Sequence, residues 1–289
     1  MAPLAIGTAQ FGIPYGVANR SGQVRPEAVD AILARAAQAG IDTLDTAAAY
    51  GESEQCLGRV GVAGWRIVTK LPPLPADVQE VERWVGARVA ESLAKLRITR
   101  LEALLLHRPR DLLGAHGEAY RRALADVKSA GQARSIGVSI YDPVELEELW
   151  DVWRPEIVQA PFNVLDRRLE RSGWLAKLGR HSVRVHARSA FLQGLLLMSP
   201  DSRHAFFAPW RDVLDGWTRW CRESGLSPLA AALGFVRAQR GIERVVVGVD
   251  SIEQLDEILA AVTPTYTEPP LDLATELRDL IEPARWKLN

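Results

Sequence analysis

Cysteine is scarce in this sequence of 289 residues, which contains only Cys56 and Cys221. The two are far apart and match no metal-ligand spacing, so neither a disulfide framework nor a cysteine-bound metal is expected. Three histidines in loops or at helix ends, His116, His181 and His204, show no metal-ligand spacing either. The sequence therefore predicts a protein of a reducing cytoplasm that binds no metal.

An excess of one charge and long apolar runs are also missing. The formal net charge is −1, so no broad basic field is present to attract nucleic acid or an anionic membrane. No apolar run approaches the roughly 18 residues that span a bilayer. The opening Met1–Gly7 lacks the basic and apolar regions of a signal peptide. The expected partner is a small molecule rather than nucleic acid or a membrane, and a homo-oligomer is left open.

Short apolar runs alternate with longer amphipathic ones along the chain. The predicted strands are Leu4–Gly7, Thr43–Asp45, Arg66–Lys70, Ala103–Leu106, Ser135–Ser139, Ile157–Ala160, Arg184–Arg188 and Arg244–Gly248. Several are continuously apolar, as strands buried on both faces are. The predicted helices are Pro26–Ala39, Val81–Leu96, Glu118–Ala130, Pro143–Trp150, one from Ser227-Pro228 to about Arg240, and one capped by Ser251 and running through Ala261.

Eight strand–helix repeats predict an α/β protein, a single (β/α)₈ TIM barrel domain over residues 1–289 with its active site at the C-terminal face. The alternative is an open doubly wound sheet. No Gly-x-Gly-x-x-Gly follows an early strand, which disfavours that sheet. Met198–Ala208 is expected to be irregular. Around it, Phe206, Phe207 and Trp210 either wall a substrate pocket or anchor the loop.

Four polar residues lie at or just after consecutive predicted strands. Asp45, Lys70 and His107 close the second, third and fourth strands, and Tyr50 follows Asp45 by five positions. The C-terminal ends of barrel strands meet in one mouth, so these side chains should converge. Taken singly, each residue has an ordinary explanation as a solvated rim group, a structural histidine or a packing aromatic. Their coincidence favours a catalytic centre.

These residue types suit the reduction of a carbonyl group. A hydride that reaches a carbonyl carbon leaves an alkoxide, and the Tyr50 hydroxyl can donate the proton that it needs. The ordinary pKa of tyrosine is about 10. The Lys70 ammonium, kept charged by Asp45, is expected to lower that pKa. His107 can donate a hydrogen bond that orients the carbonyl oxygen.

The chain resembles the aldo-keto reductases over nearly its whole length. The similarity is carried by Gly40–Glu54, Val68–Lys70, Ser92–Pro109, Gly131–Ser139 and Val158–Asn163. The resemblance implies an NAD(P)H-dependent oxidoreductase with Tyr50 as the proton donor, supported by Lys70, Asp45 and His107. The opening Gly7–Asn19 is similar to a bacterial subgroup associated with sugar and surface-polysaccharide pathways, so a sugar-derived carbonyl substrate is expected.

The resemblance also implies a cofactor groove. It assigns Ser139 and Gln159 to the nicotinamide carboxamide and puts a loop near the pyrophosphate. That loop is Gln193, Gly194 and Leu195, and the residues expected at the adenosine end are Gly248, Asp250, Ser251 and Gln254.

Two positions near the nicotinamide depart from the family. Ile140 follows Ser139 where the family usually has asparagine, and Arg188 stands where the family commonly stacks a tyrosine on the ring. The Arg188 guanidinium either stacks there, where its charge would disfavour the oxidised, cationic ring, or turns toward the pyrophosphate or a substrate anion.

The choice between the two nicotinamide cofactors is expected to be weak. Family precedent favours NADP(H), but Asp250 stands where many members hold the 2′-phosphate with a basic residue, and Ile258 replaces an adenine-binding asparagine. Asp250 can instead accept hydrogen bonds from the ribose of NAD(H). An arginine such as Arg237 or Arg240 reaching in is the alternative.

Two other functions compete with carbonyl reduction. One is a cofactor-binding regulatory or channel-associated subunit with vestigial activity, which the altered nicotinamide contacts keep open. The other is a barrel lyase that uses Lys70 as a Schiff-base amine. The complete set of Tyr50, Lys70, Asp45 and His107 favours the reductase.

Overall fold

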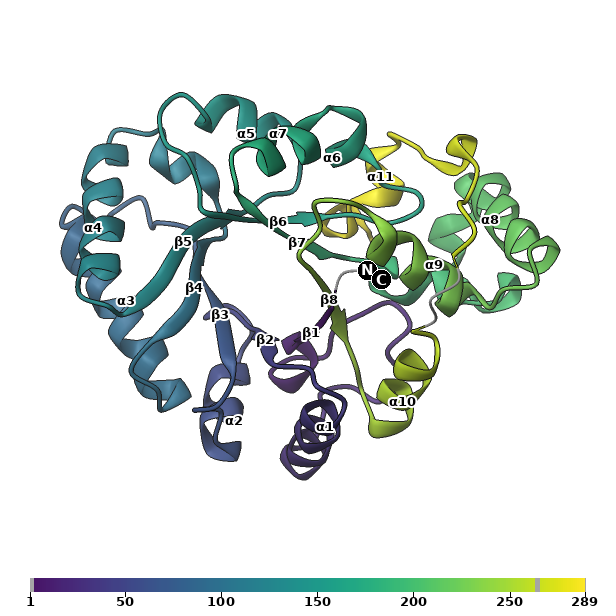
Figure 1. Cartoon of the computed structure of the whole chain (residues 1–289), viewed down its shortest axis with the longest axis horizontal. Helices are drawn as coiled ribbons and strands as arrows, with labels where there is room; N and C mark the ends of the chain where they lie inside the picture. The colour runs from purple at the N-terminus through teal and green to yellow at the C-terminus, as the bar shows by residue number, and fades with distance from the viewer. Residues whose placement is uncertain (1–2, 263–265, 289) are drawn as a thin grey trace.

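Eight parallel strands close into a barrel in chain order in the computed structural model, which describes residues 3–262 and 266–288. Figure 1 shows the strands around the centre and the helices outside them. The strands are β1 Leu4–Gly7, β2 Thr43–Asp45, β3 Arg66–Leu71, β4 Leu101–Leu106, β5 Ala133–Ser139, β6 Ile157–Pro161, β7 Arg184–Arg188 and β8 Arg244–Gly248. Since β1 pairs with β8 from Leu4↔Val245 to Gly7↔Gly248, the sheet has no open edge, and the barrel prediction is confirmed.

The helices that cover the barrel include all six that the sequence predicts, with ends that differ by at most two residues. Their bounds are α1 Pro26–Gln38, α2 Ser53–Val60, α3 Val81–Leu96, α4 Gly117–Ser129, α5 Val144–Leu149, α6 Arg168–Arg171, α7 Trp174–Arg180, α8 Arg211–Glu223, α9 Pro228–Ala238, α10 Ile252–Ala260 and α11 Arg278–Ile281. Ser227 and Ser251 cap α9 and α10, each accepting a hydrogen bond from the backbone N–H three residues later. Among the described helices, none has the length and apolar character needed to cross a bilayer.

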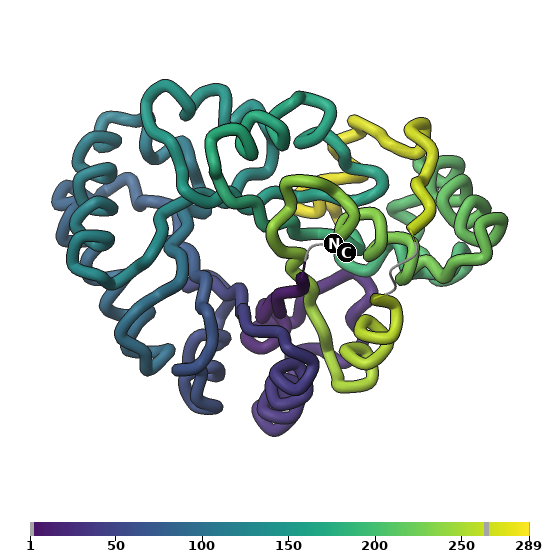
Figure 2. The backbone as a smooth tube through the Cα atoms, viewed as in Figure 1, coloured from purple at the N-terminus to yellow at the C-terminus, as the bar shows by residue number. Residues whose placement is uncertain are grey.

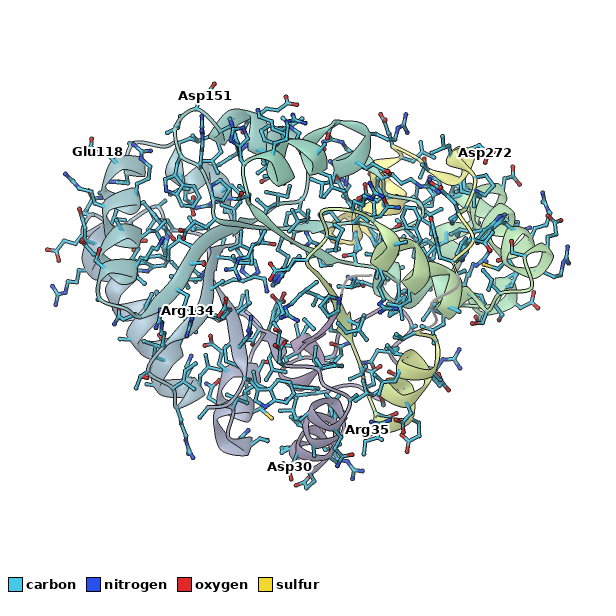
Figure 3. The ribbon with its side chains drawn as sticks, viewed as in Figure 1. Asp30, Arg35, Glu118, Arg134, Asp151 and Asp272 are labelled. Atoms are coloured by element: carbon cyan, nitrogen blue, oxygen red, sulfur yellow. The ribbon has the colours of Figure 1, made fainter. Side chains whose placement is uncertain are left out.

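Outside the barrel, the junction between β1 and β8 is covered by helices that pack on one another. Helix α1 lies between α2 and α10 (Figure 1). Arg35 Nε donates to Asp256 Oδ1 of α10 at 2.6 Å, and Figure 3 shows Asp30 and Arg35 extending outward from α1. An ion pair at this exposed edge contributes at most about 1 kcal/mol. The backbone ladder between β1 and β8 is therefore the main closure of the barrel.

The segment between β7 and β8 extends far from the barrel. It reaches out to form α8, and the C-terminal segment lies beside that helix (Figure 2). Met198–Ala208 is less irregular than expected, since it contains the 3₁₀ turn Pro200–Ser202 and part of a second, Ala205–Trp210. Phe207 is buried with its ring 4.9 Å from that of Trp286, while Phe206 packs on Trp210. These aromatics anchor the loop and do not line the cavity described next.

Candidate active site

The four residues predicted as the catalytic centre lie together at the C-terminal mouth of the barrel. Asp45, Tyr50 and His107 line a cavity of about 400 Å³, and the Lys70 side chain is buried beside them with 1% exposed. The Lys70 Nζ atom is 5.1 Å from the centre of the Tyr50 ring. The Tyr50 and His107 ring centres are 6.0 Å apart. The strand ends of β2, β3 and β4 therefore bring the four groups into one site, as expected.

The Lys70 ammonium is engaged with Asp45 rather than with Tyr50. Lys70 Nζ donates to Asp45 Oδ1 at 2.6 Å and to the Thr46 carbonyl at 2.8 Å, and it makes no hydrogen bond to the Tyr50 hydroxyl. Gln159 Nε2 donates to the other oxygen, Asp45 Oδ2, at 2.6 Å. Burial lowers the pKa of Lys70, while the Asp45 carboxylate raises it. Because Lys70 is enclosed by these partners and does not line the cavity, a Schiff base at this lysine is disfavoured.

The pKa of Tyr50 lies above its ordinary value, and the expectation that Lys70 lowers it is wrong in this structure. Burial raises the pKa of Tyr50 most, and the negative charge of Asp45 raises it further, while Arg188 lowers it. Asp45 lies against the Lys70 ammonium and cancels much of its effect on the tyrosine. The Tyr50 hydroxyl consequently carries its proton at neutral pH.

His107 is neutral over the same pH range. Burial, and then the positive charges of Lys70 and Arg188, lower the pKa of His107 to about 3. A neutral imidazole has one N–H donor and one acceptor nitrogen. His107 can therefore donate a hydrogen bond to a carbonyl oxygen without adding a positive charge to the cavity.

The loop that carries Tyr50 is held by buried contacts to which sequence reasoning gave no role. Ser53 Oγ donates to the Thr8 carbonyl at 2.8 Å, and Thr69 Oγ1 donates to Glu54 Oε1 at 2.7 Å. Ser53 and Glu54 belong to the segment quoted for the family resemblance, so their presence there was the available signal. They fix the start of α2 just after Tyr50.

Gly12 fixes the same loop by allowing the β1–α1 loop to approach the Tyr50 backbone. A Cβ atom added at Gly12 would lie 1.8 Å from the Tyr50 carbonyl oxygen and 2.5 Å from the Ser53 nitrogen. Both neighbours are backbone atoms, so a side chain at Gly12 must push the two loops apart.

We expect Gly12→Ala to lower the kcat of the reaction in which Tyr50 takes part by about tenfold or more. The reason is that a displacement of about 1 Å at a reacting group can lower a rate by up to about 100-fold. The overpacking should also lower the free energy of unfolding by about 1–3 kcal/mol. Gly64→Ala is the matched control, since a Cβ at Gly64 would meet nothing within 4 Å. Steady-state rates and thermal unfolding of both variants check this. Equal behaviour of the two variants would show that Gly12 does not position Tyr50.

Most of the residues predicted for the cofactor line the same cavity. Those that line it are Ser139, Gln159, Arg188, Gln193, Gly194, Gly248, Asp250 and Gln254. Leu195 does not, because its side chain is fully buried in the core, and Ser251 does not, because its hydroxyl caps α10. Gln159 Oε1 is buried with no hydrogen-bond partner. It is thus a free acceptor of the kind that a carboxamide N–H would satisfy.

Two loops meet across this cavity, and one of them was missed by sequence reasoning. In the β1–α1 loop, the Ala18 N–H donates to the Gln193 carbonyl at 3.4 Å, and the Tyr15 hydroxyl accepts from Gln193 Nε2 at 3.3 Å. Asn19 Nδ2 of the same loop donates to Asp250 Oδ1 at 3.3 Å. Tyr15 and Asn19 lie in Gly7–Asn19, the opening segment that resembles a bacterial subgroup.

The far end of the cavity is lined by two acidic residues, Asp250 and Glu257, and by no lysine or arginine among the described residues. Burial raises the pKa of Asp250, whose backbone N–H donates to Gln254 Oε1 at 2.8 Å. Among the described residues that line the cavity, Arg188 is the only lysine or arginine. Arg237 does not line it, and Arg240 faces a separate hollow beside Glu170. The described residues also contain no cluster of three histidine, cysteine or acidic side chains that could hold a metal.

Arg188 does not point freely into the cavity. Its Nη2 donates to the Ile140 carbonyl at 3.0 Å and its Nη1 to Ser189 Oγ at 3.2 Å. Its guanidinium carbon lies 4.6 Å from the centre of the Tyr141 ring. The stacking partner of Arg188 is thus a residue of the β5–α5 loop.

Comparison with known proteins agrees with this architecture. Residues 3–277 match the profile of the Aldo/keto reductase family. A 6-dehydroglucose reductase of Novosphingobium aromaticivorans is 33% identical over 161 residues, 50% of this chain and 52% of that protein, so the chain matches about half of its length. An L-glyceraldehyde 3-phosphate reductase of Escherichia coli O157:H7 is 26% identical over 276 residues, 81% of this chain and 79% of that protein.

Solved structures share the fold at lower sequence identity. A holo-form aldo-keto reductase from Bacillus halodurans superposes with a TM-score of 0.71 at 21% identity, covering 92% of this chain and 88% of that one. A glycerol dehydrogenase from Gluconobacter oxydans superposes with a TM-score of 0.70 at 22% identity, covering 91% and 87%. The family profile spans almost all the strands and helices described above, and the chain therefore belongs to the aldo/keto reductase family.

Proposed function

We propose that the protein is a single-domain NAD(P)H-dependent oxidoreductase that reduces an aldehyde or ketone on a sugar-derived compound to an alcohol. The observation that carries the proposal is that Tyr50 and His107, with ring centres 6.0 Å apart, line one cavity that extends to Asp250 and Ile258. The raised pKa of Tyr50 and the lowered pKa of His107 favour a protonated hydroxyl beside a neutral imidazole. Relatives named for the reduction of 6-dehydroglucose and L-glyceraldehyde 3-phosphate support a sugar-derived substrate.

The residues of the cavity fit a nicotinamide cofactor. Ser139 and the unpartnered Gln159 Oε1 would hold the carboxamide, and the loop at Gln193 and Gly194 would hold the pyrophosphate. Gly248 leaves room for the Gln10 side chain, which also lines the cavity, because a Cβ at this position would lie 2.3 Å from Gln10 Nε2. Asp250 would accept hydrogen bonds from a ribose.

The chain's own groups account for the proton and the orientation of the substrate. When bound, a reduced nicotinamide supplies the hydride that converts the carbonyl carbon into an alkoxide carbon. Tyr50 then transfers its hydroxyl proton to the alkoxide oxygen. His107 donates a hydrogen bond to the same oxygen and stabilises its developing charge. The Lys70 ammonium and the Asp45 carboxylate form an ion pair beside Tyr50, so their charges cancel there.

The test is the oxidation of NADPH and NADH in the presence of a panel of aldoses, keto-sugars and simple aldehydes. We expect turnover that depends on Tyr50. Tight cofactor binding without turnover of any carbonyl compound would refute the reductase and favour the regulatory subunit.

The pH dependence should differ between the two directions. Reduction needs protonated Tyr50 and neutral His107. The pKa of His107 is about 3 and that of Tyr50 is raised, so both forms persist across neutral pH. We expect kcat/KM for reduction to be flat from about pH 5 to about pH 9, and alcohol oxidation, which needs the phenolate, to rise with pH throughout. Rates in both directions check this, and a bell-shaped reduction profile centred near neutrality would contradict it.

Discrimination between NADPH and NADH is expected to stay within about a hundredfold in kcat/KM. The adenosine end of the cavity offers the Asp250 carboxylate, and its described lining offers no cation for a 2′-phosphate. Steady-state kinetics with both cofactors measure the ratio. A larger preference for NADPH would require a basic residue at the ribose.

A further inference from the structure

The catalytic end of the cavity has one charge that no neighbouring group balances. The Lys70 ammonium and the Asp45 carboxylate neutralise each other at 2.6 Å, and His107 is uncharged at neutral pH. The Arg188 guanidinium lines the same space and forms no ion pair with any carboxylate in the described part of the chain. A bound ligand meets a net positive charge there, and its source is Arg188.

Arg188 is also held in a fixed orientation. It donates to the Ile140 carbonyl and to Ser189 Oγ, and it stacks on Tyr141. These two bonds use two of the five N–H donors of a guanidinium, which leaves donors for a further ligand. A planar guanidinium that is already ordered suits bidentate binding of a carboxylate or phosphate, because little rotamer entropy remains to be lost.

The position of the guanidinium favours the substrate over the phosphates of a cofactor. Arg188 is bonded to the carbonyl that follows β5 and is stacked on the loop that begins there. It lines the same cavity as Tyr50 and His107, and its charge lowers the pKa of both. The loop proposed for the pyrophosphate meets the β1–α1 loop instead, and the adenosine end lies at β8 and α10. A fixed positive charge at the nicotinamide end is most useful to a substrate that carries a negative one.

We propose that Arg188, ordered by Tyr141 and the Ile140 carbonyl, binds an anionic group of the carbonyl substrate, so that the enzyme prefers carbonyl compounds bearing a carboxylate or a phosphate. The inference rests on the proposed reductase function and specifies its substrate class. The carboxylate or phosphate replaces the missing counter-ion of Arg188 and holds the carbonyl group toward Tyr50.

The test compares substrates that differ in one charged group. Succinic semialdehyde is paired with butanal, and glyceraldehyde 3-phosphate with glyceraldehyde. For the parent protein we expect kcat/KM to favour the charged member of each pair by about 30-fold or more. In Arg188→Gln that ratio should fall to about threefold or less, and Arg188→Lys should restore part of it. Arg171→Gln is the control, because Arg171 lies on α6 and faces Glu276 at the surface.

Binding of succinate to the protein loaded with NADP⁺, measured by calorimetry, gives a readout that needs no turnover. We expect Arg188→Gln to weaken it by about tenfold or more and Arg171→Gln to leave it unchanged. The inference is overturned if Arg188→Gln lowers kcat/KM for the charged and the uncharged substrates by the same factor. It is also overturned if the variant mainly weakens the binding of NADPH, which would assign Arg188 to the cofactor. If the parent protein turns over charged and uncharged substrates equally well, this inference is wrong and the proposed function stands. If the protein turns over no carbonyl compound, the proposed function is wrong.

Discussion

Replacing Tyr50 with phenylalanine should lower kcat for carbonyl reduction by about 10²–10⁴-fold, the usual worth of a positioned general acid. Phenylalanine keeps the ring that lies 5.1 Å from Lys70 Nζ and 6.0 Å from the His107 ring, and it removes only the hydroxyl. His107 has a pKa of about 3 and holds no second proton to give at neutral pH. The Lys70 ammonium is enclosed by Asp45 and the Thr46 carbonyl and does not line the cavity, so it cannot replace the lost proton donor.

The measurement is single-turnover reduction, together with a fluorescence titration of the cofactor. The dissociation constant of the cofactor should change little, because Tyr50 lies at the substrate end of the cavity. Tyr120→Phe is a matched control, since its hydroxyl is also buried but has no hydrogen-bond partner and lies on α4. If Tyr50→Phe reduced the substrate as fast as Tyr120→Phe, the proton would have another source.

Replacing Lys70 with methionine should damage both the fold and the catalytic centre. Asp45 would keep a buried carboxylate without its cation, and the removal of one partner from a buried pair typically costs about 3–5 kcal/mol. The uncompensated carboxylate would also raise the pKa of Tyr50 further. The profile of alcohol oxidation should then move to higher pH. On its acidic side the rate at a fixed pH falls about tenfold for each pH unit that the profile moves.

Denaturant unfolding and the pH profile of alcohol oxidation measure the two effects. The double variant Asp45→Asn/Lys70→Met removes both charges and keeps an acceptor for Gln159. It should therefore unfold at a higher denaturant concentration than Lys70→Met alone. A Lys70→Met protein with the parent's stability and pH profile would show that the ion pair supports neither property.

The barrel could be predicted because strands that are buried on both faces consist of continuous apolar residues, as in the run Ala103–Leu106. The parallel barrel then fixes which strand ends meet, and this is why Asp45, Lys70 and His107 could be grouped from sequence. Helix α8 was not predicted, although its buried residues Leu214, Trp217 and Cys221 have the i, i+3, i+7 spacing of an amphipathic helix. It is an additional helix ahead of α9 in the β7–β8 connection, which a simple strand–helix repeat does not include.

The hydrogen-bond partners inside the site could not be predicted in the same way. Strand order places Asp45 of β2 beside Lys70 of β3, whereas Gln159 lies on β6 across the barrel. Only the folded structure shows that Lys70 and Gln159 each donate to one oxygen of the Asp45 carboxylate. Burial of the Tyr50 ring, and then the charge of Asp45, raise the pKa of Tyr50, whereas residue spacing alone had predicted a lowered one. The contact of Arg188 with Tyr141 depends likewise on side-chain conformation, which residue spacing does not determine.

Asp45 connects the lysine to the cavity wall, since one of its oxygens accepts from Lys70 and the other from Gln159, a residue that lines the cavity and whose buried Oε1 has no hydrogen-bond partner. A ligand bound at Gln159 and the proton on Lys70 therefore share a single carboxylate and are thermodynamically linked. Linkage is reciprocal, so the factor by which a change in Lys70 protonation alters the affinity for that ligand equals the factor by which the ligand alters the affinity of Lys70 for its proton. The pH dependence of the ligand's dissociation constant and the proton uptake or release on binding therefore report the same coupling free energy.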